Sequence, residues 1–141
     1  MLHHLRLALN GRLPASAKSA YLKLRELNAG SRAYPDFLIV GAMKAGTTSL
    51  FNYLCLHPQV LGSLPKETFY FCSHPHSEGG ECRYRRHFPL RSTLKAKNAI
   101  CGEASPTYLT SESAPFHAAQ LIPDVKIIAL LREPAERAVS H

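Results

Sequence analysis

Short apolar runs alternate along the chain with stretches whose apolar residues recur at helical spacing. Residues 36–42 read DFLIVGA, residues 98–104 read NAICGEA and residues 125–131 read VKIIALL. Apolar runs of this length bounded by turn residues predict buried strands. The run 125–131 is continuous and rich in branched side chains, which is typical of a strand covered on both faces.

A helix is predicted after each of these strands. The first runs from about residue 47 to 58, the second over residues 111–121 with Ser111 or Ser113 as its cap, and the third opens within residues 132–141. Strands that alternate with helices indicate a parallel sheet with right-handed crossovers. The sequence therefore predicts an α/β fold. Residues 62–97 are rich in His, Gly, Pro and Arg, and we expect them to form a long excursion outside the core.

The first 34 residues differ from the rest in charge. The formal net charge of the chain is +7, and residues 1–35 hold six basic residues against one acidic residue. Within this leader Ala17, Tyr21, Leu24 and Leu27 lie near helical spacing, which predicts a basic amphipathic helix of about three turns. We expect its apolar stripe to pack on the domain, in preference to a role at a membrane surface or on nucleic acid. The remainder is nearly balanced, so no nucleic-acid partner is expected.

The four cysteines follow no zinc-ribbon spacing; they are Cys55, Cys72, Cys82 and Cys101. The first and the last lie in apolar runs and are predicted to be inert core residues. The middle two flank the segment SHPHSEGGE. A metal site that includes His74 and His76, a polar surface loop and a local disulfide remain open there.

The strand 36–42 leads into the segment GAMKAGTTS. Gly41 and Gly46 have the glycine spacing of a nucleotide phosphate loop, but Lys44 lies inside the loop instead of following the second glycine. The N–H groups of residues 44–49 and the hydroxyls that follow Gly46 predict an anion cradle at the start of a helix.

Three segments should meet at the carboxyl edge of the sheet, namely 41–49, 103–106 and Arg132. A triphosphatase needs Mg²⁺ held partly by an Asp at the end of a nearby strand, whereas the strand 125–131 is followed by Arg132. A lysine over the cradle neutralises a bridging oxygen without a divalent ion. These features argue against ATP and GTP as ligands.

The segments PDFLIVGAMKAGTTSL and IIALLREPAERAVSH resemble the 5′-phosphosulfate loop and the 3′-phosphate motif of the sulfotransferase family. PKETFYF and GEASPTYLT are similar to segments of the branch that contains heparan sulfate and related carbohydrate sulfotransferases, and of bacterial relatives. The resemblance covers residues 35–141. It implies a P-loop-like three-layer fold, with a central parallel sheet flanked by helices, that is truncated at the C-terminus.

The resemblance also implies roles for individual residues. Lys44 would stabilise the leaving phosphate oxygen of the donor, 3′-phosphoadenosine 5′-phosphosulfate, and Arg132 and Ser140 would bind its 3′-phosphate. Glu67 would be the general base, with Lys66 touching donor or acceptor. The 5′-phosphosulfate would be bound by Lys44, Ala45, Gly46, Thr47, Thr48 and Ser49. Ala104 stands where the branch often carries a lysine.

The resulting hypothesis is a sulfuryl transfer to an acceptor hydroxyl of a carbohydrate, without a metal. A P-loop-type nucleotide kinase or hydrolase and a non-catalytic nucleotide-binding fragment are the alternatives. We expect residues 1–34 to be a leader and residues 35–141 to be the N-terminal part of a sulfotransferase domain, with weak or absent activity on its own. Arg83, Arg85 and Arg86 would meet an anionic sugar or face water.

No apolar run approaches the roughly 18 residues of a membrane span, and residues 5–11 are too short and polar for a signal-peptide core. The sequence thus predicts a soluble cytoplasmic protein. The Golgi lumen is the alternative if the chain is a fragment of a longer protein.

Overall fold

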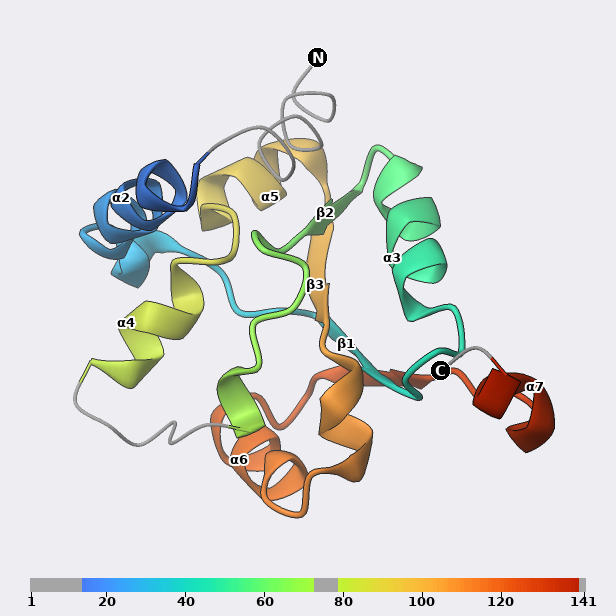
Figure 1. The fold of residues 1–141 in the computed structure, drawn as a ribbon. Helices are drawn as coiled ribbons and strands as arrows, with labels where there is room; N and C mark the ends of the chain where they lie inside the picture. Colours follow the sequence, from blue (N-terminus) through green and yellow to red (C-terminus); the bar gives the residue numbers. More distant parts are fainter. Residues whose placement is uncertain (1–13, 73–78, 140–141) are drawn as a thin grey trace.

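The computed structural model describes residues 14–72 and 79–139. Its centre is a four-stranded, wholly parallel sheet in the order β2-β3-β1-β4 (Figure 1). The strands are β1 (Phe37–Gly41), β2 (Val60–Gly62), β3 (Ile100–Ala104) and β4 (Lys126–Ala129). The three predicted strands and their parallel direction are confirmed. The short strand β2 was not predicted, because three residues give too little periodicity to detect.

Helices cover both faces of the sheet. The α-helices are α2 (Ala15–Glu26), α3 (Thr47–Leu56), α4 (Gly80–Arg85), α5 (Arg91–Lys97), α6 (Ala114–Leu121) and α7 (Pro134–Val139). The 3₁₀ turns are η1 (Ala29–Ser31), η2 (Tyr70–Cys72) and η3 (Pro106–Thr110). Figure 1 shows α3 on one side of the sheet and α4 on the other. This three-layer α/β arrangement confirms the predicted fold class.

The central strand β1 divides the core between these two layers. Side chains alternate along a strand, so Phe37 and Ile39 pack toward α3, where Phe51 meets them. Leu38 and Val40 join the cluster on the opposite face. All five side chains are buried, and each contributes about 1.5–3 kcal/mol by leaving water.

The expectation that residues 62–97 lie outside the core was wrong. Phe71, Tyr84 and Phe88 from this segment are fully buried. Tyr84 stacks on Tyr70 with ring centroids 4.3 Å apart and meets Phe88 edge-on at 4.9 Å. The polar composition of the segment concealed its aromatic residues, which cover the face of the sheet opposite α3 with large apolar rings.

The expectation that the strand 125–131 is covered on both faces was also wrong. Ile127 is 57% exposed and Leu131 is 81% exposed. β4 stands at the end of the strand order and pairs only with β1 among the described strands. A continuous apolar run indicates burial, but it does not reveal which strand becomes an edge.

Helix α2 packs on the domain with a different face from the one predicted. Leu24 and Leu27 of its apolar stripe are 65% and 84% exposed, whereas Arg25 is only 7% exposed. Arg25 Nη2 donates a hydrogen bond of 2.6 Å to the carbonyl oxygen of Phe88. A buried carbonyl group needs a donor, and here a guanidinium group from the leader provides it.

Two of the arginines considered for an anionic sugar hold the fold together instead. Arg85 Nη2 donates to the carbonyl oxygens of Arg32 and Gly30, at 2.6 and 2.7 Å. Arg86 forms an ion pair of 2.7 Å with Glu26 of α2. Arg85 thus ties α4 to the segment around η1, and Arg86 ties it to α2, so neither of the two expected roles applies to them.

His87 generates a prediction about stability and pH. Its Nδ1 lies 2.7 Å from the carbonyl oxygen of Leu64, so Nδ1 carries a proton and donates it to that oxygen. Burial lowers the pKa of His87 from 6.5 to about 4. Between these values the unfolded chain binds more protons, so the free energy of unfolding decreases as the pH falls, by up to about 3 kcal/mol.

Urea unfolding at several pH values from 7 to 4.5 measures this decrease. The variant His87→Asn places an amide nitrogen near the same carbonyl but does not titrate, so its stability should depend less on pH than that of the wild type. His57→Asn, at an exposed position, is the matched control. Equal pH dependence in the wild type and in His87→Asn would contradict the prediction.

Candidate functional site

The loop between β1 and α3 has the backbone of an anion cradle. Lys44 has φ +60° and Gly46 has φ +93°, both in the left-handed region. Gly46 is the N-cap of α3, and Thr47 is its first residue. The first amide groups of a helix have no acceptor within it and attract an anion.

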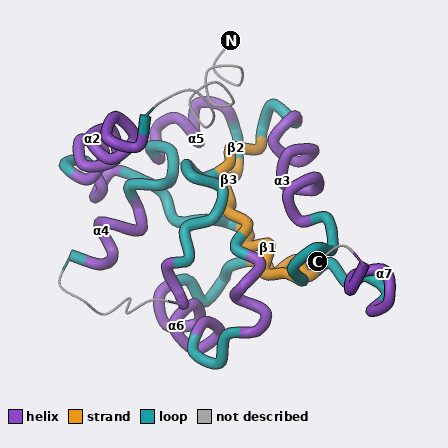
Figure 2. The backbone as a smooth tube through the Cα atoms, in the orientation of Figure 1, coloured by secondary structure: helices purple, strands orange, loops and turns teal. Residues whose placement is uncertain are grey.

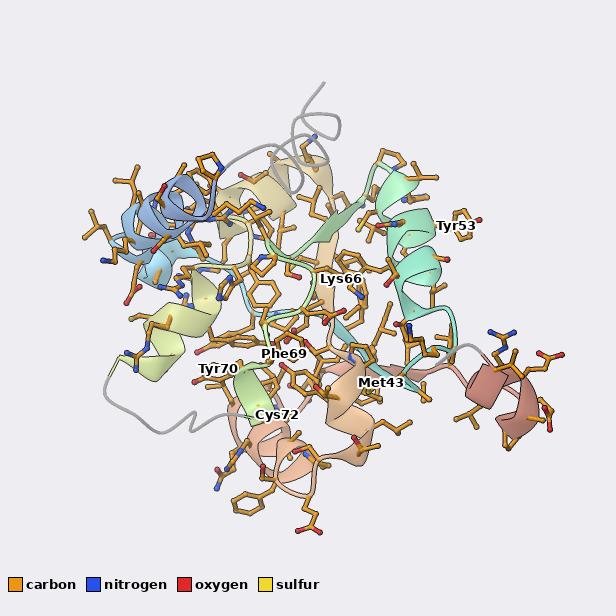
Figure 3. All side chains as sticks on the ribbon, in the orientation of Figure 1. Met43, Tyr53, Lys66, Phe69, Tyr70 and Cys72 are labelled. Atoms are coloured by element: carbon orange, nitrogen blue, oxygen red, sulfur yellow. The ribbon has the colours of Figure 1, made fainter. Side chains whose placement is uncertain are left out.

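Charged and hydroxyl groups gather at this loop. Thr47 is buried, while Lys44, Thr48 and Ser49 are exposed. Lys66, on the segment after β2, donates from Nζ to Thr48 Oγ1 at 2.9 Å. Figure 3 shows Lys66 between β3 and α3. The segment PKETF therefore lies against the loop, although 18 residues separate these two side chains in the sequence.

A cavity of about 370 Å³ opens at this point. Its lining comes from three separate segments: Met43, Lys44, Gly46, Thr47, Thr48, Glu67, Phe69, Pro106 and Thr107. Glu67 forms an ion pair of 2.6 Å with Lys66. The structure thus brings the predicted base and the predicted loop to one cavity. Ala45 and Ser49 belong to the same loop and helix start but do not line the cavity.

Arg132 lies beside the same loop. Its Nη1 is 3.5 Å from the carbonyl oxygen of Lys44, and its Nε donates to Glu136 at 3.2 Å. Figure 1 shows α7, which follows Arg132, next to the loop between β1 and α3. Lys44 and Arg132 therefore occupy one edge of the sheet. Ser140 lies outside the described residues.

Some lining residues were not predicted from the sequence. Met43 lies within the loop, and Thr107 follows the segment 103–106 that was expected at this edge. Phe69 is 41% exposed and has φ +53°. A large apolar side chain in a left-handed conformation is unusual, but its position inside PKETFYF gives no sign of this before the fold is known.

Glu103 of β3, which contacts Thr68 on the segment that carries Glu67, is fully buried. Burial raises the pKa of its carboxyl group, an effect that hydrogen bonds from Thr68, Tyr84 and Ser105 partly offset. Burial also raises the pKa of Tyr108, whose hydroxyl lies 3.2 Å from Glu103 Oε1. A carboxyl group without solvent contact therefore holds Thr68, which lies between the lining residues Glu67 and Phe69.

Over the described part of the chain, no cluster of His, Cys, Asp or Glu could hold a metal ion. His74 and His76, which were considered as ligands, lie outside that part. Cys72 and Cys82 are exposed free thiols, so the structure has no disulfide between them. Cys101 is buried, as predicted, while Cys55 is half-buried.

Two further cavities lie away from these residues. One, of about 690 Å³, is lined by Asp36, Ile100 and Lys126 at the amino ends of the strands. The other, of about 330 Å³, is an apolar space between α6 and the sheet. Parallel sheets bind ligands at the carboxyl ends of their strands, which favours the 370 Å³ cavity as the functional site.

The sequence is similar to that of several sulfotransferases. It is 36% identical over 119 residues to the bifunctional heparan sulfate N-deacetylase/N-sulfotransferase 1 of Caenorhabditis elegans, covering 81% of this chain and 13% of that protein. It is 41% identical over 110 residues to the human enzyme 2 of the same name, covering 75% and 12%. It is 38% identical over 107 residues to the membrane-associated sulfotransferase kil1 of Dictyostelium discoideum, covering 76% and 22%.

The fold is similar to the crystal structure of a sulfotransferase from Alicyclobacillus acidocaldarius. The TM-score is 0.54 at 33% sequence identity, covering 77% of this chain and 48% of that one. No family model matches the sequence. The chain thus spans less than a quarter of the length of each relative named above and about half of the solved structure.

Gly41, which ends β1, generates a prediction. A Cβ at this position would lie 2.8 Å from Leu109 Cβ and 2.9 Å from the carbonyl oxygen of Pro106, at φ +149°. The variant Gly41→Ala should therefore push η3 away from the loop and reduce the free energy of unfolding by about 1–3 kcal/mol. Gly30→Ala is the control, since a Cβ there has no neighbour within 4 Å. Equal stabilities of the two variants in urea unfolding would refute the close approach of η3 to the loop.

Proposed function

The chain belongs to the sulfotransferase family, whose members use a sulfonate donor, and we propose that the protein transfers a sulfuryl group from 3′-phosphoadenosine 5′-phosphosulfate to a hydroxyl group of a carbohydrate. The carbohydrate acceptor is suggested by relatives whose names refer to heparan sulfate. These relatives are much longer, so donor and acceptor alike are proposals for this protein.

One observation carries the proposal: Lys44, the start of α3 and Glu67 line the same cavity, with Arg132 beside the loop. The cradle has room for an anion, because a Cβ placed on Gly46 would find no atom within 4 Å. Exposed hydroxyls at Thr48 and Ser49 supply further donors. Fixed positive charge and oriented N–H groups suit a phosphosulfate group.

In this mechanism the acceptor hydroxyl attacks the sulfur atom in line with the departing phosphate. Lys44 stabilises the charge that develops on the leaving oxygen, and residues 45–49 bind the 5′-phosphosulfate. Arg132 and Ser140 bind the 3′-phosphate. Glu67, which lines the same cavity, accepts the proton of the attacking hydroxyl.

Lys66 adds a further positive charge beside the loop that carries Lys44. The branch of the family that this chain resembles often has a lysine at the position of Ala104, and this chain does not. The amide of Ala104 donates to the carbonyl oxygen of Lys66 at 3.1 Å, while Lys66 Nζ reaches Thr48. We include Lys66 in the site as the cation that stands in for the missing lysine.

The division of the chain into a leader (1–34) and part of a sulfotransferase domain (35–141) stays a prediction. No helix in residues 14–72 or 79–139 has the length and hydropathy of a membrane span. A cytoplasmic location, with the Golgi lumen as the alternative, stays a prediction.

Calorimetric titration with adenosine 3′,5′-bisphosphate tests donor binding. Because Lys44 and Arg132 supply the positive charge, the bisphosphate should bind equally well with Mg²⁺ and with a chelator. ATP with Mg²⁺ should bind more weakly. A preference for Mg²⁺-ATP over the bisphosphate would instead support a nucleotide kinase or hydrolase.

The variant Lys44→Ala tests the role of the loop lysine. Sulfuryl transfer should fall by about 10²–10³, because a positioned charge is lost where negative charge develops. The control is Lys95→Ala, an exposed lysine on α5. If the wild type shows no measurable transfer, binding of the bisphosphate is measured instead. Lys44→Ala should then bind it more weakly than the wild type, and Lys95→Ala should bind it equally well. Unchanged binding and transfer in Lys44→Ala would rule out the assigned role.

A further inference from the structure

The segment 63–69, which carries Lys66 and Glu67, runs along the end of β3. Figure 2 shows it as loop backbone beside that strand. Its first amide, Ser63 N, donates to Gly102 O at 2.8 Å, and Ala104 N donates to Lys66 O at 3.1 Å. Main-chain hydrogen bonds thus fix the segment as far as Lys66. Different contacts hold it beyond that point.

These contacts converge on Glu103. Its carboxylate accepts hydrogen bonds on Oε1 from the hydroxyls of Tyr84 and Tyr108, at 2.7 and 3.2 Å. Oε2 accepts from Thr68 Oγ1 at 2.6 Å, from Ser105 Oγ at 2.8 Å and from Thr68 N at 3.2 Å. All of these groups donate to the carboxylate, which is the pattern that an ionised side chain satisfies. Oε1 accepts from the two tyrosines, whereas the hydrogen bonds between Glu103 and the segment 63–69 are all made by Oε2.

Oε2 and Ser105 together hold a strained turn. Ser105 Oγ accepts hydrogen bonds from the amides of Thr68 and Phe69, at 3.1 and 3.3 Å. Phe69 has φ +53°, which costs about 1–3 kcal/mol for a residue other than glycine and persists only where the surroundings enforce it. Glu103 accepts hydrogen bonds from Thr68 and Ser105, and these contacts hold Phe69 in this conformation.

Glu67 and Phe69, the residues on either side of Thr68, both line the cavity. Thr68 itself points the other way, into the buried network. We propose that Glu103 is a positioning residue, which through Thr68 and Ser105 holds Lys66 and Glu67 against the phosphate loop. This inference rests on the proposed function only for the task that Lys66 and Glu67 perform. Glu103 is not a catalytic residue, since it is fully buried and does not line the cavity.

A matched pair of substitutions at Thr68 separates positioning from stability. Thr68→Val keeps the shape of the side chain but removes the hydroxyl that donates to Oε2, whereas Thr68→Ser retains it. We expect Thr68→Val to weaken binding of adenosine 3′,5′-bisphosphate about fivefold to tenfold, the size of one typical intramolecular hydrogen bond. Thr68→Ser should bind within about twofold of the wild type.

Tyr84→Phe is the control for stability. It removes a hydrogen bond to Oε1 and leaves every contact of Oε2 with the segment 63–69 in place. We expect a lower melting temperature with unchanged bisphosphate binding. If Tyr84→Phe weakens binding as much as Thr68→Val, or if Thr68→Val binds as the wild type does, the positioning role is overturned. Glu103→Gln places a donor where only donors surround it, and it should lose both stability and affinity.

Amide hydrogen exchange tests the same claim without any ligand. The amides of residues 66–69 should exchange at least about tenfold faster in Thr68→Val than in the wild type and in Thr68→Ser, with α5 and α6 unchanged. Equal exchange in all three proteins would overturn the proposal. If the wild type binds no bisphosphate, the proposed function fails, and the exchange rates still decide whether Glu103 positions the segment.

Discussion

The parallel direction of the four strands is the constraint on which the site depends. Parallel strands place all their carboxyl ends at one edge, so the segments that follow β1, β3 and β4 meet there. Hydrogen bonds continue the pairing of β1 and β4 past the strand ends, with Ala42 N bonded to Leu130 O at 2.6 Å and Leu130 N bonded to Gly41 O at 2.7 Å. This pairing brings Lys44 and Arg132 to the same edge, although 88 residues separate them in the sequence.

Buried polar groups hold distant segments of the molecule together. Arg25 and Arg32 both donate to the carbonyl oxygen of Phe88, and Arg85 donates to the carbonyl oxygen of Arg32. Arginine side chains between residues 25 and 85 therefore donate hydrogen bonds to main-chain carbonyl oxygens inside the fold. Glu103 has the complementary role, since its carboxylate accepts hydrogen bonds from donors on several segments. In both cases a low local dielectric strengthens these hydrogen bonds and makes their loss costly.

Much of the fold could be predicted because local patterns carry it. The strands 36–42, 98–104 and 125–131 and the helices that follow them are confirmed, as is the α/β class. The burial of Phe71 and Tyr84 could not be predicted, because their neighbours in the sequence are polar and the sheet face that they cover is formed by distant residues. The exposure of Leu24 on α2 has a similar origin. Arg25 donates a hydrogen bond to the buried carbonyl oxygen of Phe88, and with Arg25 on the buried face of the helix the apolar stripe faces solvent.

For the site, the sequence by itself determined the loop chemistry. The glycine spacing, the displaced Lys44 and the hydroxyls after Gly46 lie within a few residues of one another, and local backbone geometry is enough to make them an anion cradle. Only the tertiary structure decided what faces that cradle. Lys66 and Glu67 reach it because the neighbouring Thr68 donates a hydrogen bond to the buried carboxylate of Glu103 on β3, 35 residues away in the sequence. Hydrogen bonds across such separations depend on how strands pair and turns close, and no periodicity in the sequence encodes them.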